Sequence, residues 1–354
     1  MKRVAYVSHE FPRLTETFTL KEVEGLGAAG IEVEPWTLLP TGKARLVERS
    51  LPSPVVVPLL ASRRLPRRAL AAMRGASLAR SLYRARDHVH AQFPLEASNA
   101  AFFGARAAGC TYSFSGHTYH RLDLMPEKLA AASFVVVGSD FEVELLCRRY
   151  GEGWRPKIEV RRLGVPPRPS REGFEQGLVV SLGTLGAKKG HDVLVRAVAE
   201  LDGARLEVIG DGPERAALEA LARELDVEDR VRFAGALEHE AALAAVARAN
   251  VFALACIETP DGDHDCLPVA LMDAMSLGVP CVSSNAFGIP ELIADGVSGL
   301  LAPPGDVPAL ADRIAALLGH PDEIGHAGRE TVRARYDLDT NVAALAELFR
   351  DRLR

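Results

Sequence analysis

Short apolar runs alternate with longer segments of helical periodicity along most of this 354-residue chain. The runs Arg3–Ser8, Ala131–Gly138 and Val231–Gly235 have the length and the apolar content of buried strands. Segments with apolar residues at every third or fourth position follow them, as in amphipathic helices. Because strands that alternate with helices build parallel sheets with helices on both faces, we predict an α/β fold of two doubly wound domains.

A proline-rich stretch interrupts this alternation once, at Gly164–Ser170. Such a stretch is a semi-rigid connector and is typical of a domain boundary. We therefore predict an N-terminal domain over residues 1–165, a linker over 166–176, a C-terminal domain over 177–335 and a final helix over 336–354.

The composition is that of an ordinary globular protein, with 48% hydrophobic and 25% charged residues. The formal net charge of −5 disfavours nucleic acid as a partner. Five cysteines are scattered without a Cys-x-x-Cys pair, which indicates reduced thiols in the cytoplasm rather than disulfides or a zinc site. No apolar run approaches about 20 residues, and strand-like sequence begins at once, so we expect neither a spanning helix nor a signal peptide.

Positive charge is concentrated between Lys43 and Arg86, where eleven basic residues are accompanied by Glu48 as the one acidic residue. Apolar side chains lie between the basic ones. A basic amphipathic segment can lie on the anionic inner face of a membrane or meet an acidic acceptor. A basic helix that is simply solvated is the alternative interpretation.

The most informative stretch for function covers residues 261–291. A polar, acidic loop ends at Asp265, and a segment with helical spacing begins at Leu267, with Pro268 in its first turn. Asp273 comes eight positions after Asp265, so both carboxylates are expected to lean over the same end of this helix.

This arrangement suits a particular class of ligand. The free N–H groups of the first turn, from Cys266 onward, form a site for an anion such as a diphosphate. The two carboxylates can accept hydrogen bonds from the hydroxyls of a ribose or a hexose. Diphosphate between two sugar rings is a nucleotide sugar, which is the predicted ligand. An acidic loop that only caps a core helix is the alternative.

Two further strand ends carry polar residues. The strand Leu178–Gly183 is followed by a glycine-bearing loop in which Lys188 and Lys189 suit phosphate groups, although lysine–glycine turns are common. In the other half, His117 follows the strand Tyr112–Ser115. Ligands gather at such strand ends in open α/β sheets, so His117 is a candidate ligand contact.

These motifs resemble those of a known family. The pair Asp265 and Asp273, followed by Ala-Met and by Gly288–Glu291, resembles the Glu-x7-Glu motif of family-4 retaining glycosyltransferases of the GT-B fold. Asp stands here at both Glu positions, and Cys266 stands where Gly is common. The run 11–18 is similar to the opening loop of bacterial exopolysaccharide members of that family, of the colanic-acid type.

The lysine loop carries the resemblance further. Lys189 matches the lysine of the family's Lys-Gly pair, whereas Thr184 stands where the family has an arginine on the diphosphate. The resemblance implies a GT-B fold, in which two Rossmann-like domains face a central cleft and the last helix crosses back towards the N-terminal domain.

The resemblance also implies an activity. It implies a hexosyltransferase that moves a sugar from a UDP- or GDP-linked donor to a carbohydrate, lipid-linked or small-molecule acceptor with retention, without metal or cofactor. His117 and Asp265 would be the catalytic residues. The implied donor-binding residues are Gly183, Thr184, Lys188, Lys189, Cys266, Leu267, Asp273 and Glu291.

Two other functions remain open. Because Thr184 and the two aspartates depart from the family's motif, the chain can instead be a non-catalytic nucleotide-sugar-binding or scaffold protein. An epimerase that acts on a nucleotide sugar in the same fold is the other alternative.

Overall fold

The computed structural model describes residues 3–10, 17–38, 45–46, 67–82, 87–116, 123–319 and 322–353. The chain divides into two compact units. Unit 1 comprises Met1–Arg162 and Asp339–Arg354, and unit 2 comprises Leu163–Leu338. The expected linker, residues 166–176, therefore lies within unit 2. Among the residues that the structure describes, no helix is long and apolar enough to cross a membrane.

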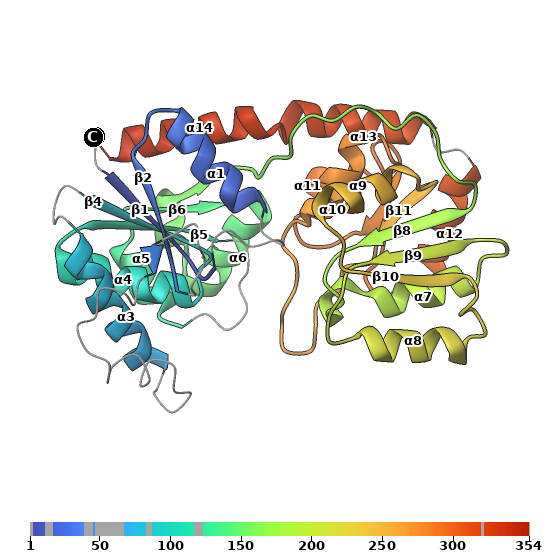
Figure 1. Ribbon diagram of the computed structural model, residues 1–354, viewed down its shortest axis with the longest axis horizontal. Coiled ribbons are helices and arrows are strands. Elements are labelled where there is room, and N and C mark those ends of the chain that lie inside the picture. Colours follow the sequence, from blue (N-terminus) through green and yellow to red (C-terminus); the bar gives the residue numbers. More distant parts are fainter. Residues whose placement is uncertain are drawn as a thin grey trace. The chain divides into compact units, whose positions relative to one another are not determined.

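Unit 1 is built on a seven-stranded parallel sheet with the strand order β3-β2-β1-β4-β5-β6-β7 (Figure 1). Helices α3 and α4 pack against each other beside β4 and β5. The core on the other face joins Val4 and Tyr6 of β1 to Leu345 and Phe349 of α14. The elements of unit 1 are β1 (Arg3–Ser8), α1 (Thr17–Ala28), β2 (Val33–Thr37), β3 (Arg45–Leu46), α3 (Arg67–Ser81), β4 (Asp87–Gln92), α4 (Glu96–Ala108), β5 (Thr111–Gly116), α5 (Met125–Ala131), β6 (Phe134–Val137), α6 (Asp140–Tyr150), η3 (Glu152–Lys157), β7 (Ile158–Val160) and α14 (Leu338–Arg352).

Unit 2 is built on a six-stranded parallel sheet with the order β10-β9-β8-β11-β12-β13. Helices α7, α8 and α12 share one hydrophobic core with the sheet, and α9, α10 and α13 pack together on its other side (Figure 1). The elements of unit 2 are β8 (Leu178–Leu182), η4 (Ala187–Lys189), α7 (His191–Ala199), β9 (Arg205–Ile209), α8 (Arg215–Glu224), β10 (Val231–Gly235), α9 (His239–Ala247), β11 (Val251–Leu254), α10 (Val269–Ser276), β12 (Cys281–Ser284), α11 (Ile289–Leu292), β13 (Leu300–Ala302), α12 (Val307–Gly319) and α13 (Asp322–Arg335).

Both units confirm the predicted doubly wound α/β architecture, because each sheet is parallel and its strand order reverses direction once from an inner strand. One predicted strand is shorter than expected. The run Ala131–Gly138 was expected to be a single strand, but Ala131 ends α5 and β6 begins at Phe134. Alanine is a strong helix former, and it extends α5 at the expense of the strand.

Candidate functional site

Loops of unit 2 meet at the carboxyl edge of its sheet, because all its strands run parallel. Gly210 follows β9, and a Cβ atom on it would lie 1.9 Å from the carbonyl oxygen of Gly183. Gly190 has a φ of +63°, and a Cβ atom there would lie 1.9 Å from the carbonyl oxygen of Ala255. Only glycine permits these backbones to approach so closely. The loop that carries the two lysines is therefore fixed against its neighbours.

The lysines of this loop contact acidic residues of the loop that follows β11. The Nζ atom of Lys188 lies 3.2 Å from Asp263 Oδ1 and 3.3 Å from Asp265 Oδ1. Lys189 pairs with the other carboxylate oxygen of Asp265. The backbone N–H of Ile257 also donates to the carbonyl oxygen of Lys188 over 3.0 Å. Ion pairs and a backbone hydrogen bond thus connect the two loops.

These partners keep each other ionised. Burial opposes the charge of Asp265, but Lys189 and Lys188 outweigh it and hold the pKa of Asp265 below its usual value. Burial likewise opposes the charges of Lys188 and Lys189. The pKa of each lysine is nevertheless raised, by Asp265 and, for Lys188, also by Asp263. A diphosphate bound here would share the two ammonium groups with Asp265 and Asp263.

The acidic loop itself is a compact turn held by Thr259. The backbone N–H of Thr259 donates to the carbonyl oxygen of Asp263 over 2.9 Å, and the N–H of Asp263 donates to Thr259 Oγ1 over 2.9 Å. Gly262 takes the left-handed φ of +82° that closes the turn. The orientation of Asp263 towards Lys188 is therefore fixed locally.

His264, which directly precedes Asp265, stacks on Phe287 of the loop after β12. The rings of His264 and Phe287 are 4.5 Å apart and inclined by 10°. Phe287 has a φ of +57°, a left-handed conformation that costs a residue with a side chain about 1–2 kcal/mol. The carbonyl oxygen of Cys266 accepts a hydrogen bond of 2.8 Å from the N–H of Gly288. The loops after β11 and β12 are thus joined on both sides of Asp265.

Helix α10 begins later than the sequence indicated. We expected helical structure from Leu267, with Asp265 at its start, but the helix begins at Val269. Pro268 is the N-cap residue, with a ψ of 120°, rather than a first-turn residue. A residue before proline disfavours the helical region, which keeps Leu267 outside the helix. Asp265 therefore lies in the loop. The N–H of Leu271 donates to the carbonyl oxygen of Pro268 over 3.2 Å, so the first-turn N–H groups open to a ligand are those of Val269 and Ala270.

Asp273 lies on α10 among different charges from those around Asp265. It is 5% exposed, and no described group donates a hydrogen bond to its carboxylate. Burial raises its pKa to about 6, and the positive charges of His239 and Arg168 act in the opposite direction. The structure therefore groups Asp265 with the lysines and Asp273 with His239.

Sequence reasoning missed His239 and Arg168 as neighbours of Asp273. His239 is the first residue of α9, and the only signal was a polar pair, His239-Glu240, just after a predicted strand. Arg168 lies in the proline-rich stretch, where we expected only a connector. His239 and Arg168 are far from Asp273 in the sequence, so only the folded structure shows that they are its neighbours.

The remaining predicted site residues are placed as follows. Gly183 lies at the end of β8, beside the Lys189 side chain; Thr184 is exposed; and Leu267 is buried. Glu291 lies on α11, where its carbonyl oxygen accepts hydrogen bonds from Arg335 and Tyr336. His117 lies outside the described residues, as does most of the run 11–18. Within the described ranges, no three His, Cys, Asp or Glu side chains are grouped as metal ligands.

The loops of this edge match a known family. The family described as Glycosyl transferases group 1 matches residues 168–331, which include the lysine loop and Asp273. The GDP-mannose-dependent alpha-(1-6)-phosphatidylinositol monomannoside mannosyltransferase of Mycolicibacterium smegmatis is 33% identical over 276 residues, which are 70% of this chain and 72% of that protein. This chain belongs to the group 1 glycosyltransferases. The predicted family is confirmed.

Other members of the group 1 glycosyltransferases match a smaller part of the chain. A putative colanic acid biosynthesis glycosyltransferase of Escherichia coli K12 is 37% identical over 171 residues, 46% of this chain and 42% of that protein. The chain thus spans about half the length, or less, of several curated relatives that it matches.

A solved structure shows the fold of this group 1 glycosyltransferase. Sucrose-phosphate synthase from Thermosynechococcus elongatus is similar with a TM-score of 0.79 and 21% identity, over 99% of each chain. The fold is GT-B, as the sequence predicted.

Proposed function

We propose that the protein is a retaining glycosyltransferase with a nucleotide-sugar donor. The observation that carries this proposal is the cluster of Lys188, Lys189 and Asp265 at the carboxyl edge of the unit 2 sheet, in a chain of the group 1 family. Open α/β sheets bind their ligands at this edge. Two ammonium groups suit a diphosphate, and a carboxylate suits sugar hydroxyls.

Each residue of the edge has a part in this proposal. Lys189, Lys188 and the first-turn N–H groups of α10 would stabilise the negative charge that develops on the departing diphosphate. Asp265 would accept hydrogen bonds from the transferred sugar, and Asp273 from the ribose. His117 would contact the reacting sugar, and the departing phosphate would take the proton of the acceptor hydroxyl. Gly183, Thr184, Cys266, Leu267 and Glu291 would complete the donor site.

The acceptor is proposed from the chemistry of the relatives. One relative is named for GDP-mannose and phosphatidylinositol monomannoside, and another for colanic acid biosynthesis. A glycan or lipid-linked acceptor fits both. The basic segment 43–86, of which the structure describes 45–46 and 67–82, would then contact an anionic membrane. Sedimentation with anionic and with neutral vesicles tests this contact.

The donor is identified by thermal shift with UDP, GDP, ADP and their common sugar conjugates, followed by a transfer assay. Lys189→Ala should lower kcat/KM by about a hundredfold or more, because it removes a charge that stabilises the transition state. Lys21→Ala is the matched control, because this lysine is exposed on α1 in unit 1. It should leave kcat/KM unchanged.

The other two functions predict different results. Donor binding without turnover over a broad acceptor panel would support the binding protein and contradict the transferase. Conversion of the donor to an isomer without any acceptor would support the epimerase. If Lys189→Ala transferred sugar at the wild-type rate, the proposed role of the lysines in stabilising the diphosphate would be contradicted.

A further inference from the structure

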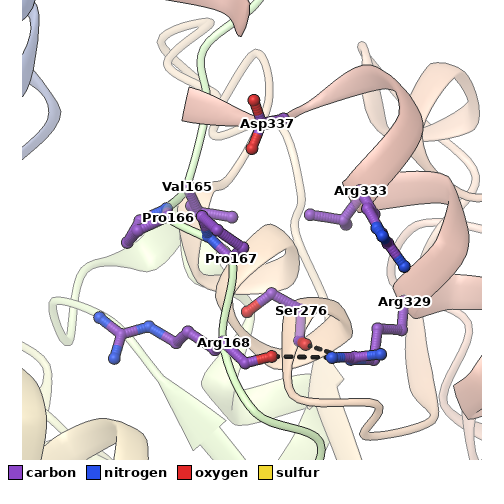
Figure 2. A pocket seen from close by; sticks show the side chains of 9 residues that line it. Val165, Pro166, Pro167, Arg168, Ser276, Arg329, Arg333 and Asp337 are labelled. Atoms are coloured by element: carbon purple, nitrogen blue, oxygen red, sulfur yellow. Dashed lines mark hydrogen bonds between the residues drawn. The ribbon is translucent and has the colours of Figure 1, made fainter. Parts of the chain in front are cut away.

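A cavity of about 280 Å³ lies in unit 2, and none of the predicted donor-binding residues lines it. One wall is formed by Val165, Pro166 and Pro167 of the segment that enters unit 2, and another by Arg329 and Arg333 of α13 (Figure 2). Small-molecule sites begin at roughly this size, at about 300 Å³. The cavity therefore has room for a small metabolite.

The apolar wall is held in place by backbone pairing. Val165 forms a parallel bridge with Asp337, and its N–H donates to the carbonyl oxygen of Tyr336 over 2.9 Å. The N–H of Leu338 donates back to the carbonyl oxygen of Val165 over 3.2 Å. A Cβ atom on Gly164 would lie 2.5 Å from the Cα atom of Leu338, so the two segments are in close contact. Backbone hydrogen bonds within the chain thus hold this wall in place.

The basic wall presents two guanidinium groups one helical turn apart. Arg329 donates from Nε to the carbonyl oxygen of Ser276 over 3.2 Å and from Nη2 to the carbonyl oxygen of Arg168 over 2.9 Å (Figure 2). These bonds orient the group and leave Nη1 for a ligand. Arg333 has no hydrogen-bonding or ion-pair partner among the described residues. Like charges at this spacing repel, and an anion between them would remove the repulsion.

The opposite end of the cavity has the opposite charge. Figure 2 shows Asp337 at the far end of the pocket from Arg329. Its carboxylate can accept hydrogen bonds from hydroxyls but repels a second anionic group. A ligand that suits this cavity therefore has one anionic end and one hydroxylated end.

We propose that this cavity binds a small phosphate monoester, with its phosphate at Arg329 and Arg333 and its hydroxyls towards Asp337. A phosphate dianion has three oxygens that can accept bonds from both guanidinium forks, and it suits arginine better than a single carboxylate does. The proline wall contacts the carbon skeleton. The site lies apart from the lysine cluster of the proposed donor site and does not depend on it.

Isothermal titration of the full chain with glucose 6-phosphate tests the proposal. The compound should bind one site per chain, glucose should not bind, and Arg333→Gln should raise the Kd about tenfold or more, as loss of a charge-assisted bond does. Asp337→Asn should reduce the preference for glucose 6-phosphate over inorganic phosphate. Arg313→Gln, on α12 and outside the cavity lining, is the matched control and should leave the Kd unchanged.

The variants also separate this site from the lysine loop. Binding that survives Lys189→Ala and is lost in Arg333→Gln supports the cavity, whereas the reverse pattern places the phosphate at the lysines and overturns the proposal. Absence of binding to the wild-type chain at millimolar concentration also overturns it.

A parallel arm with vesicles distinguishes a free metabolite from a lipid headgroup. Binding to phosphatidic acid vesicles that needs Arg333 and is displaced by glucose 6-phosphate would assign the phosphate to a lipid.

Discussion

At the scale of single residues, Asp273 has a position that is costly for a carboxylate. It is 5% exposed, no described group donates a hydrogen bond to it, and burial raises its pKa to about 6. The charges of His239 and Arg168 offset part of this cost. A buried group whose pKa is perturbed, and which lowers stability, is typical of a binding site.

Replacement of Asp273 by asparagine should therefore stabilise the ligand-free protein. The folded pKa of about 6 lies above the ordinary 3.8, so the contribution of Asp273 to stability is full below pH 3.8 and is lost as the pH rises through 6. Asp273→Asn should raise the free energy of unfolding above pH 6 by at most about 3 kcal/mol. Urea unfolding at about pH 4 and about pH 8 measures the difference, which should appear only at the higher pH.

The same substitution should weaken the binding of the nucleotide-sugar donor. A hydrogen bond from a ribose hydroxyl to a carboxylate contributes about 1.5–3 kcal/mol, whereas one to a neutral amide contributes about 0.5–1.5 kcal/mol. Donor affinity of the wild-type protein should rise as the pH passes through about 6, and Asp273→Asn should lack this rise. A variant that is less stable at high pH, or that binds the donor as the wild type does, would contradict this role of Asp273.

At the scale of elements, the packing of the lysine loop depends on Gly190. Its φ of +63° is unfavourable for alanine, and a Cβ atom would also lie 1.9 Å from the carbonyl oxygen of Ala255. Gly203 is a matched control, because it has a φ of +73° with open space around its Cβ position. Gly203→Ala should cost about 1–2 kcal/mol, and Gly190→Ala should cost at least about 2 kcal/mol more because the backbone at Ala255, just after β11, must move.

Urea denaturation of both variants measures these costs. Gly190→Ala should also reduce the thermal shift produced by the donor, since Lys188 and Lys189 directly precede this position. Equal destabilisation of the two variants would show that the loop accommodates a side chain at residue 190.

The elements that the sequence predicted well are those that depend on residues close together in the chain. Ser139 directly precedes α6, and its Oγ accepts a hydrogen bond from the N–H of Glu142, as a serine at the start of a helix commonly does. The strand Val231–Gly235 has the predicted bounds. Both depend on residues within a few positions of each other, so a sequence pattern contains the information.

The site was only partly predictable for the opposite reason. Asp265 and the two lysines were recognised by spacing and resemblance, but their ion pairs join two loops that meet only in the folded sheet. The proximity of Asp273 to His239 and Arg168 likewise follows from the packing of α9 and α10 and from the path of the chain before β8. A periodic sequence pattern does not indicate which of these distant residues come into contact.

At the scale of the whole molecule, each unit has its own hydrophobic core, and each has a buried carboxyl group whose pKa is raised. In unit 1, Tyr6 Oη lies 2.7 Å from Glu22 Oε2 and 2.8 Å from Gln92 Oε1. Burial raises the pKa of Glu22 to about 7, against a smaller opposite effect of the bond from Tyr6. Asp273 is the corresponding group in unit 2. The two carboxyl groups give each unit a separate pH dependence.

Glu22 and a buried lysine of the same unit, Lys128, change the stability of unit 1 over different ranges of pH. The contribution of Glu22 to stability is full below pH 4.5 and is lost as the pH rises through about 7. Burial lowers the pKa of Lys128 from 10.5 to about 7. The cost of burying that charge is constant below pH 7 and declines only above it. Between pH 4.5 and 7, the change in unit 1 from these two groups therefore comes from Glu22.

Because the cores are separate, the two units should unfold in separate transitions. A substitution in one unit should shift the transition temperature of that unit alone. Glu22→Gln keeps a partner for Tyr6 and cannot ionise, so at about pH 8 it should stabilise unit 1 by at most about 3 kcal/mol. Asp273→Asn should move only the transition of unit 2. Calorimetry of both variants and the double variant at about pH 4 and about pH 8 measures these shifts, which should add if the units are independent. If either substitution moves both transitions together, the units unfold as one cooperative body and the separation of their pH dependences fails.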